Sequence, residues 1–315
     1  MPYDYTAGGN NTTNLSNSIL RVYSKEILFY AQPVTRFDQF AIQKTELGVT
    51  PGQMISMLRY NNLDKGGALT EGTRMAIKTL VGSLVNIQVT EYGNAVAITE
   101  LLLHTSFDDV MSSASKLLGF DMAKVIDSLV RDAFLTSGNK LYAGDSVDRA
   151  NILATSGLGT AEIKDAVEFL KTNDAPQLGA GYYVCFAHPH QLRTLRDDPN
   201  WISAQHYGSP ENLFNGEVGR IEDVIFVEST MVTSGLTTNP YSYVEALVSG
   251  TAGNKGTIYQ SIFFGDNAVG RATALPVEMR DNGIVDFGRE HGLAWYGITG
   301  AGMLTEANTV IVETC

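Results

Sequence analysis

The hydrophobic pattern is clearest between residues 86 and 137, where an alternating segment leads into a segment of helical period. Apolar residues of the first segment alternate with polar ones at Val85, Ile87 and Val89, which predicts a half-buried strand. After Gly93 the alternation changes phase, because Val96 and Ile98 stand at even positions. We expect a bulge or bend at this glycine, and two strands joined by a turn at 92–94 are the alternative.

The second segment carries an apolar stripe of helical spacing from Phe107 to Phe134. We expect one helix of about 30 residues and roughly 45 Å, beginning at Ser106 as the N-cap. Such a length, against a mean of about 11–12 residues, indicates a backbone that spans the molecule, although a core helix of an ordinary domain has the same stripe. Gly119 is a candidate kink and Gly138 a candidate end.

A two-stranded excursion precedes this pair of elements. Residues 53–60 (QMISMLRY) predict a strand, residues 61–67 are rich in turn formers, and the strand described above is the return. An isolated hairpin is marginally stable in water, so we expect its packing partner to be another subunit. The excursion is locally basic, with Arg59, Lys65, Arg74 and Lys78 facing only Asp64 and Glu71. This favours docking onto an acidic neighbour, and a solvated loop of ordinary charge is the alternative.

The remaining pattern predicts a polar N-terminal arm and a mixed middle region. Residues 1–18 are polar, and 19–30 predict a short amphipathic helix. Further helices are expected at 160–171 and from Pro189 onward, and strands at 182–187, 223–228, 243–249, 258–264, 292–299 and 309–313. We expect the last two strands to return beside the long helix.

Composition narrows the class of protein. The chain has 315 residues, 44% of them hydrophobic, and a net charge of −12, which does not suit a protein that condenses nucleic acid. No apolar run approaches the about 20 residues of a membrane span, and the N-terminus lacks the pattern of a signal peptide, so cytoplasmic synthesis is expected.

Candidate chemistry is sparse. The sequence has no G-x-S-x-G, P-loop, H-E-x-x-H or C-x-x-C motif. Cys185 with His188 and His190 is the sharpest cluster, and it keeps a hydrolase or transferase reading open. A buried, inert thiol is the favoured interpretation, and a disulfide to Cys315 cannot be argued from the sequence. We therefore expect no catalytic residue, no cofactor and no metal ligand.

Several short segments follow one another in an order that resembles a known family. The segments are 68–72 (ALTEG), 89–94 (VTEYGN), 97–101 (AITEL), 124–132 (KVIDSLVRD), 216–221 (GEVGRI), 264–268 (FGDNA) and 292–296 (GLAWY). Together they resemble the major capsid proteins of tailed bacteriophages with the Hong Kong ninety-seven type of fold, and more narrowly the podovirus N-four coat protein family. The resemblance covers roughly residues 36–315.

The resemblance implies an α+β capsid fold. Residues 1–50 would be the N-terminal arm, 51–100 the extended loop, 101–140 with 271–315 the peripheral domain around a spine helix, and 141–270 the axial domain. Six residues are the candidates for contacts between subunits: Arg59, Lys65, Arg74, Lys78, Asp108 and Asp109.

The resemblance also implies the partners. Copies of the chain would form the hexamers and pentamers of an icosahedral shell around double-stranded DNA, without sequence-specific binding or a membrane. A separate scaffolding protein, a portal and a decoration protein are expected, with assembly in the host cytoplasm and residence in the virion. A self-assembling tail tube or sheath protein is the alternative reading, ahead of the hydrolase.

Overall fold

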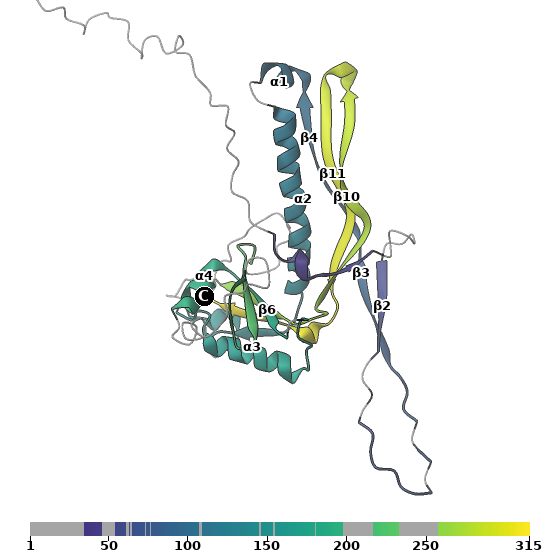
Figure 1. The fold of residues 1–315 in the computed structure, drawn as a ribbon, viewed down its shortest axis with the longest axis vertical. Coiled ribbons are helices and arrows are strands. Elements are labelled where there is room, and N and C mark those ends of the chain that lie inside the picture. Colours follow the sequence, from purple (N-terminus) through teal and green to yellow (C-terminus); the bar gives the residue numbers. More distant parts are fainter. Residues whose placement is uncertain are drawn as a thin grey trace, which may run out of the picture. The chain divides into compact units, whose positions relative to one another are not determined.

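The structure is a computed structural model, and it describes residues 35–45, 54–60, 63, 65–72, 74, 75, 77–106, 109–144, 146–153, 155–179, 181–197, 217–232 and 258–315. All of these lie in the unit Pro33–Cys315. The strands form a six-stranded sheet, a four-stranded sheet and a two-stranded hairpin (Figure 1). The helix expected at 19–30, the strand expected at 243–249 and Asp108 lie outside the described residues.

The six-stranded sheet is built mainly from the middle of the chain. Its order is β5 (Lys140–Tyr142), β12 (Thr309–Thr314), β9 (Tyr259–Phe264), β6 (Tyr183–Ala187), β8 (Val224–Glu228) and β7 (Glu217–Ile221). Strands β6 and β12 are buried along their whole length. Continuous apolar runs of this kind are typical of strands that are covered on both faces.

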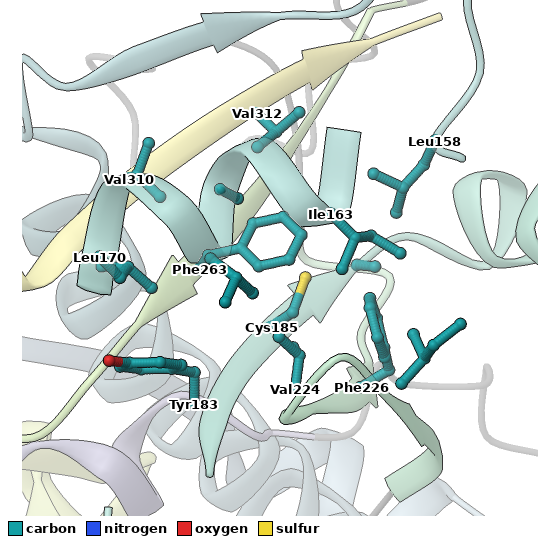
Figure 2. Close-up of a cluster of buried hydrophobic side chains, with 14 of the residues drawn as sticks. Leu158, Ile163, Leu170, Tyr183, Cys185, Val224, Phe226, Phe263, Val310 and Val312 are labelled. Carbon is teal, nitrogen blue, oxygen red and sulfur yellow. The ribbon is translucent and has the colours of Figure 1, made fainter. Parts of the chain in front are cut away.

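Helices supply that cover. On one face, α3 (Thr160–Thr172) and α4 (Pro189–Arg196) pack against alternate residues of β6, among them Tyr183 and Cys185. Figure 2 shows both side chains pointing into the cluster that contains Ile163 and Leu170 of α3. On the other face, Phe186 packs with Phe134 near the end of the long helix α2 (Val110–Leu135). The sheet therefore has a core on both sides.

The four-stranded sheet has the order β1 (Ile42–Lys44), β10 (Val269–Val285), β11 (Glu290–Met303) and β4 (Thr90–Thr99). Helix α2 packs on it through a cluster that contains Leu118, Val125 and Trp295. The indole of Trp295 donates a hydrogen bond to Asp121 of α2 (2.9 Å). The long β10 was not predicted, because Pro276, charged residues and three register shifts against β11 obscure its period.

The hairpin pairs β2 (Met54–Tyr60) with β3 (Gly82–Gln88) in an unbroken antiparallel register. The predicted alternation of β3 is confirmed, with Ile87 buried and its sequence neighbours exposed. At its root, Ile55 and Ile87 pack with Val89 and Ala272. Chain continuity then carries β3 through Val89 into β4, so the polypeptide leaves the hairpin and enters the four-stranded sheet at that residue.

The bulge expected at Gly93 is wrong, and so is the alternative of a turn there. Strand β4 pairs with β11 from Thr90 to Thr99 without a shift, and the break lies at Val89 instead. Gly93 has a different role, because a Cβ at this position would come within 2.7 Å of the Trp295 carbonyl oxygen. The change of phase in the sequence reflects a move from one sheet to another.

The start of the long helix also differs from the prediction. Thr99 caps a short helix α1 (Glu100–Thr105), and Ser106 is the C-cap of α1. Asp109 is the N-cap of α2, because its carboxylate accepts a hydrogen bond from the Ser112 amide (3.1 Å). Helix α2 has 26 residues, about 39 Å, and it continues through Gly119 without interruption.

The C-terminal strand is a further correction. Residues 309–313 were expected beside the long helix, as was 292–299. Strand β11 does contact α2, but β12 pairs with β9 and β5 inside the six-stranded sheet. All six residues of β12 are buried, so the sheet's interior is the environment that this apolar run requires. The other predicted strands and helices that the structure describes are confirmed within a few residues.

Candidate functional site

The outer face of the hairpin leaves apolar side chains in contact with solvent. Because β2 and β3 pair without a shift, Leu58 lies opposite Leu84, and Tyr60 lies opposite Gly82. Leu58, Tyr60 and Leu84 are 57%, 64% and 65% exposed. A Cβ at Gly82 would touch the side chains of Leu58 and Tyr60, so these two side chains occupy the space that a side chain at position 82 would take. The hairpin thus presents an apolar face that its own described chain does not cover.

The connection between β2 and β3 extends this apolar surface. We call residues 54–88 the excursion; it comprises β2, β3 and their connection (Figure 1). Its described connecting residues include Leu63, Leu69, Met75, Ile77, Leu80 and Val81, each more than half exposed. Exposed apolar side chains gathered in this way mark an interaction surface, whereas scattered ones need no explanation.

The four basic residues predicted as interface candidates divide into two groups. Arg59 lies on β2, and its guanidinium donates a long hydrogen bond (3.5 Å) to the Leu304 carbonyl of the same chain. Lys65, Arg74 and Lys78 lie on the connection and are exposed. The structure therefore engages Arg59 with Leu304 of its own chain and places the other three among the exposed apolar residues of the connection.

A second exposed surface lies at the edge of the four-stranded sheet where β4 and β10 end and β11 begins. We call it the α1 surface; it consists of α1 with Thr99 and of residues 284–290. Leu101, Ile284 and Phe287 are 74%, 72% and 104% exposed. Asp286 and Phe287 have left-handed backbone angles, with φ of 49° and 57°, at the turn between β10 and β11. Sequence reasoning missed this surface, although the run of three leucines at 101–103 was a signal.

Acidic groups surround a pocket of about 580 Å³ in the α1 surface. Its lining contains Thr99, Glu100, Leu101, His104, Asp286, Arg289 and Glu290. Two of the carboxylates have partners within the surface. Oε1 of Glu100 lies 3.5 Å from Nε2 of His104, and Oδ2 of Asp286 lies 3.5 Å from Nη1 of Arg289. The carboxylates outnumber the single arginine, so the pocket is suited to a basic, partly apolar ligand.

The two acidic candidates, Asp108 and Asp109, stand at the start of α2 in the sequence. Asp109 caps α2, so its carboxylate is engaged within its own helix. Asp108 lies outside the described residues.

The cluster of Cys185, His188 and His190 has the geometry of a structural element. Cys185 is fully buried, burial raises the pKa of its thiol, and the side chain faces the apolar cluster in Figure 2. His188 caps α4 by accepting a hydrogen bond from the His190 amide through Nδ1 (3.2 Å), and its ring stacks on Tyr259. Both cysteines are free thiols. A nucleophile needs an accessible thiolate, which this buried thiol does not provide.

Among the described residues, no group of three or more His, Cys, Asp or Glu residues could hold a metal ion. No helix in the described parts of the chain is both long enough and apolar enough to cross a membrane. The arrangement that remains is two apolar surfaces of opposite charge character, which can bury area by association.

The chain is similar in sequence to a known protein family. A family model described as "Phage capsid protein" matches residues 84–310. No curated protein matches the chain.

Solved structures of phage capsids resemble the chain over nearly its whole length. The capsid of the cyanophage P-SCSP1u is 14% identical, with 99% of this chain and 96% of that chain covered and a TM-score of 0.71. For the capsid of the cyanophage Pam1 the identity is 16%, the coverage 95% and 97%, and the TM-score 0.73. The head of the Helicobacter pylori bacteriophage KHP40 is 13% identical, with 98% of this chain and 99% of that chain covered and a TM-score of 0.70. These likenesses confirm the predicted α+β fold of the Hong Kong ninety-seven type.

Proposed function

The chain belongs to the phage capsid protein family, and from this premise we propose that it is the major subunit of an icosahedral shell around double-stranded DNA. As a capsid protein it is a structural component of the virion and not an enzyme. The fold it shares with the capsids and head described above supports a role in the shell wall. In this proposal, copies of the chain form hexamers and pentamers.

The exposed apolar face of the excursion is the observation that carries the proposal of self-assembly. Among the described residues between 54 and 84, ten large apolar side chains are at least half exposed. Burial of each on a partner would contribute roughly 25 cal/mol per Å² of apolar area removed from water, less the cost of association. A shell supplies such a partner at every position, because each subunit meets further copies.

The α1 surface of a second copy is the docking partner that fits the excursion best. It combines exposed leucines with an acidic pocket, and the excursion combines exposed apolar residues with Lys65, Arg74 and Lys78. Opposite charges at an interface fix its register and suppress wrong pairings. We therefore propose that Glu100, Asp286 and Glu290 of one copy receive basic residues of another.

The domain organisation is part of the same proposal. Residues 1–50 act as the arm, and 51–100 include the extended loop, whose paired part ends at Gln88. Residues 101–140 and 271–315 form the peripheral domain, and residues 141–270 form the axial domain. Strand β12 of the first range pairs with β9 of the second, so the two domains are joined within the six-stranded sheet. The scaffolding protein, the portal, the decoration protein, assembly in the host cytoplasm and the narrower N-four resemblance stay predictions.

A pair of charge reversals tests the docking. Lys65→Glu with Arg74→Glu places acidic groups on the excursion, opposite the acidic pocket. We expect the variant to fold but to form closed shells at least about tenfold less efficiently, because like charges at an interface cost several kcal/mol. Electron microscopy and sedimentation measure the shells, and circular dichroism measures the fold.

Lys164→Glu with Arg193→Glu is the matched control. It changes the net charge by the same amount on exposed positions of α3 and α4. Equal shell yields from the two variants would refute the docking, and a wild-type chain that forms only open tubes would refute the shell proposal.

A further inference from the structure

Asp127, in the C-terminal half of α2, binds the segment that precedes the excursion. Its carboxylate is fully buried and accepts three hydrogen bonds from consecutive backbone amides. Oδ2 accepts from the Arg36 amide (3.0 Å), and Oδ1 accepts from the amides of Phe37 (2.7 Å) and Asp38 (3.0 Å). Three N–H groups aimed at one carboxylate form a concave anion site made of backbone. The start of this segment is thereby fixed to the long helix.

The same segment contacts the six-stranded sheet through two aromatic rings. Phe37 is fully buried, with its ring centroid 4.1 Å from that of Phe186 on β6. The ring of Phe40 lies 5.4 Å from Phe186 and 5.4 Å from Phe264 on β9, edge-on to both. Such aromatic pairs contribute to stability beyond the apolar area that they bury. The segment is therefore part of the sheet's core.

Contacts to the four-stranded sheet complete the set. Residues 42–44 form β1, which pairs in parallel with residues 270–272 of β10. Asp38 also forms an ion pair with Arg271 of β10, with 2.6 Å between Oδ1 and Nη1. One short stretch of chain thus bonds to α2 and to both sheets.

We propose that residues 36–44, the latch, hold the two sheets in a fixed relation to each other, with the Asp127 carboxylate as the attachment point. Burial raises the pKa of Asp127, and the three N–H groups only partly offset that effect. The carboxylate supplies the acceptors for three consecutive N–H groups, and an apolar side chain in its place would leave those groups without an acceptor. The geometry of the carboxylate therefore selects one position for the latch.

The latch lies within one subunit, and its contacts do not depend on the proposed assembly. If the latch couples the sheets, releasing it from Asp127 increases the motion of one sheet relative to the other. If the latch only fills space, releasing it changes local exchange and nothing else. The two outcomes are separable by measuring local opening and the distance between sheets in the same variant.

Hydrogen exchange of the full chain measures the attachment. Asp127→Asn replaces one acceptor oxygen with a donor that faces the latch amides. We expect the amides of residues 36–38 to exchange at least about tenfold faster, since hydrogen bonds to a charged group are stronger than those to a neutral one. Asp165→Asn, the same change at an exposed position of α3, is the control and should leave these rates unchanged. Unchanged rates in Asp127→Asn would overturn the attachment.

Paired spin labels measure the coupling. Glu168→Cys on α3 and Asn282→Cys on β10 are exposed positions that report on the two sheets. Cys185 and Cys315 are buried, and burial raises the pKa of both thiols, so the introduced cysteines react first. We expect a narrow distance distribution in the wild-type background and a broader one with Asp127→Asn.

A second variant keeps the test valid if Asp127→Asn fails to fold. Asp38→Ala removes the ion pair with Arg271 and leaves the three bonds to Asp127 in place. We expect it to broaden the distance distribution while the Arg36 and Phe37 amides stay protected. A distribution as narrow as that of the wild type in this variant, or in a folded Asp127→Asn chain, would overturn the coupling.

Discussion

The six-stranded sheet and the excursion use apolar residues in opposite ways. Strand β6 is buried at every position, with α3 and α4 on one face and α2 on the other. Strand β2 has the apolar residues Met54, Leu58 and Tyr60 at least half exposed. The sheet completes its core within the chain, whereas the excursion leaves its outer face for a second molecule. Substitutions in the first region should change folding, and substitutions in the second should change assembly.

The largest expected effect is in the sheet. Phe186 is fully buried and contacts Phe37, Phe134 and Phe264. Phe186→Ala should lower the free energy of unfolding by about 3–5 kcal/mol, because the cavity cannot close completely. Urea unfolding measures the loss. Leu58→Ala, on the excursion, should cost less than about 0.5 kcal/mol in the unassembled chain, and similar losses in the two variants would abolish the contrast.

The next largest effect is expected in the excursion, where substitutions should reduce assembly and leave folding almost unchanged. Leu58→Asp with Leu84→Asp places charge on the cross-strand pair of the excursion's outer face. We expect unfolding to change little and the yield of shells to fall at least about tenfold, because two leucines that would be buried on association are replaced. Sedimentation of assembly reactions measures the yield.

A control on the same face separates lost apolar area from added charge. Ser56→Asp with Asn86→Asp adds the same charges to the neighbouring cross-strand pair, which is also exposed. It should assemble better than the leucine variant. Equal yields would mean that charge, and not apolar burial, governs the excursion.

A smaller effect follows from an ion pair between a buried carboxylate of the six-stranded sheet and a partly exposed arginine. Glu313 on β12 is buried and bonds to Arg149 and to Gln260 (2.9 Å). Burial alone would raise the pKa of Glu313, but Arg149 and Gln260 outweigh it and hold the pKa below the usual 4.5. The unfolded chain therefore takes up the proton first, so stability is present above pH 4.5 and is lost as the pH falls through the folded pKa.

Replacing the carboxyl group tests this dependence. Glu313→Gln should lose the part of the acid dependence that lies below pH 4.5, as measured by urea unfolding at a series of pH values. It should also be less stable than the wild type at neutral pH, because Arg149 loses its partner. An acid profile identical to that of the wild type would contradict the assigned role.

The sequence predicted the sheet better than it predicted the surfaces. Runs such as 183–187 and 309–314 are apolar enough to identify buried strands from local pattern alone. Their partners are not local, so β12 was expected beside α2 although it pairs with β9. Strand β10 was missed because its register shifts remove the period of two on which strand recognition depends.

The excursion was predicted because its apolar residues alternate and because basic residues outnumber acidic ones in it. The α1 surface has no such periodicity. Leu101 and Phe287 are far apart in the sequence, and only the pairing of β4 with β11 and of β11 with β10 brings their segments to one end of the sheet. Ser106 was expected as the N-cap of the long helix, but serine and aspartate both cap helices. The short helix α1, whose C-cap is Ser106, moves the N-cap of α2 to Asp109.

The smallest expected effect concerns the cap of α4 in the six-stranded region. Nδ1 of His188 accepts a hydrogen bond from the His190 amide, which requires the neutral imidazole. Burial, and then the neighbouring His190, lower the pKa of His188 below 6.5. The unfolded state therefore binds the proton first, and stability that is present above pH 6.5 is lost as the pH falls below that value.

The histidine can be replaced by a cap that does not titrate. Asparagine is a favoured N-cap, so His188→Asn should keep α4 capped, whereas His188→Ala should cost about 1 kcal/mol at neutral pH. Unfolding free energies at about pH 7.5 and about pH 5.5 should differ less in His188→Asn than in the wild type. His104→Asn, on the exposed α1, should keep the wild-type difference. If His188→Asn showed the same difference in unfolding free energy between the two pH values as the wild type, the loss of stability in mild acid would arise from groups other than His188. The two regions would then not differ in how their stability depends on pH.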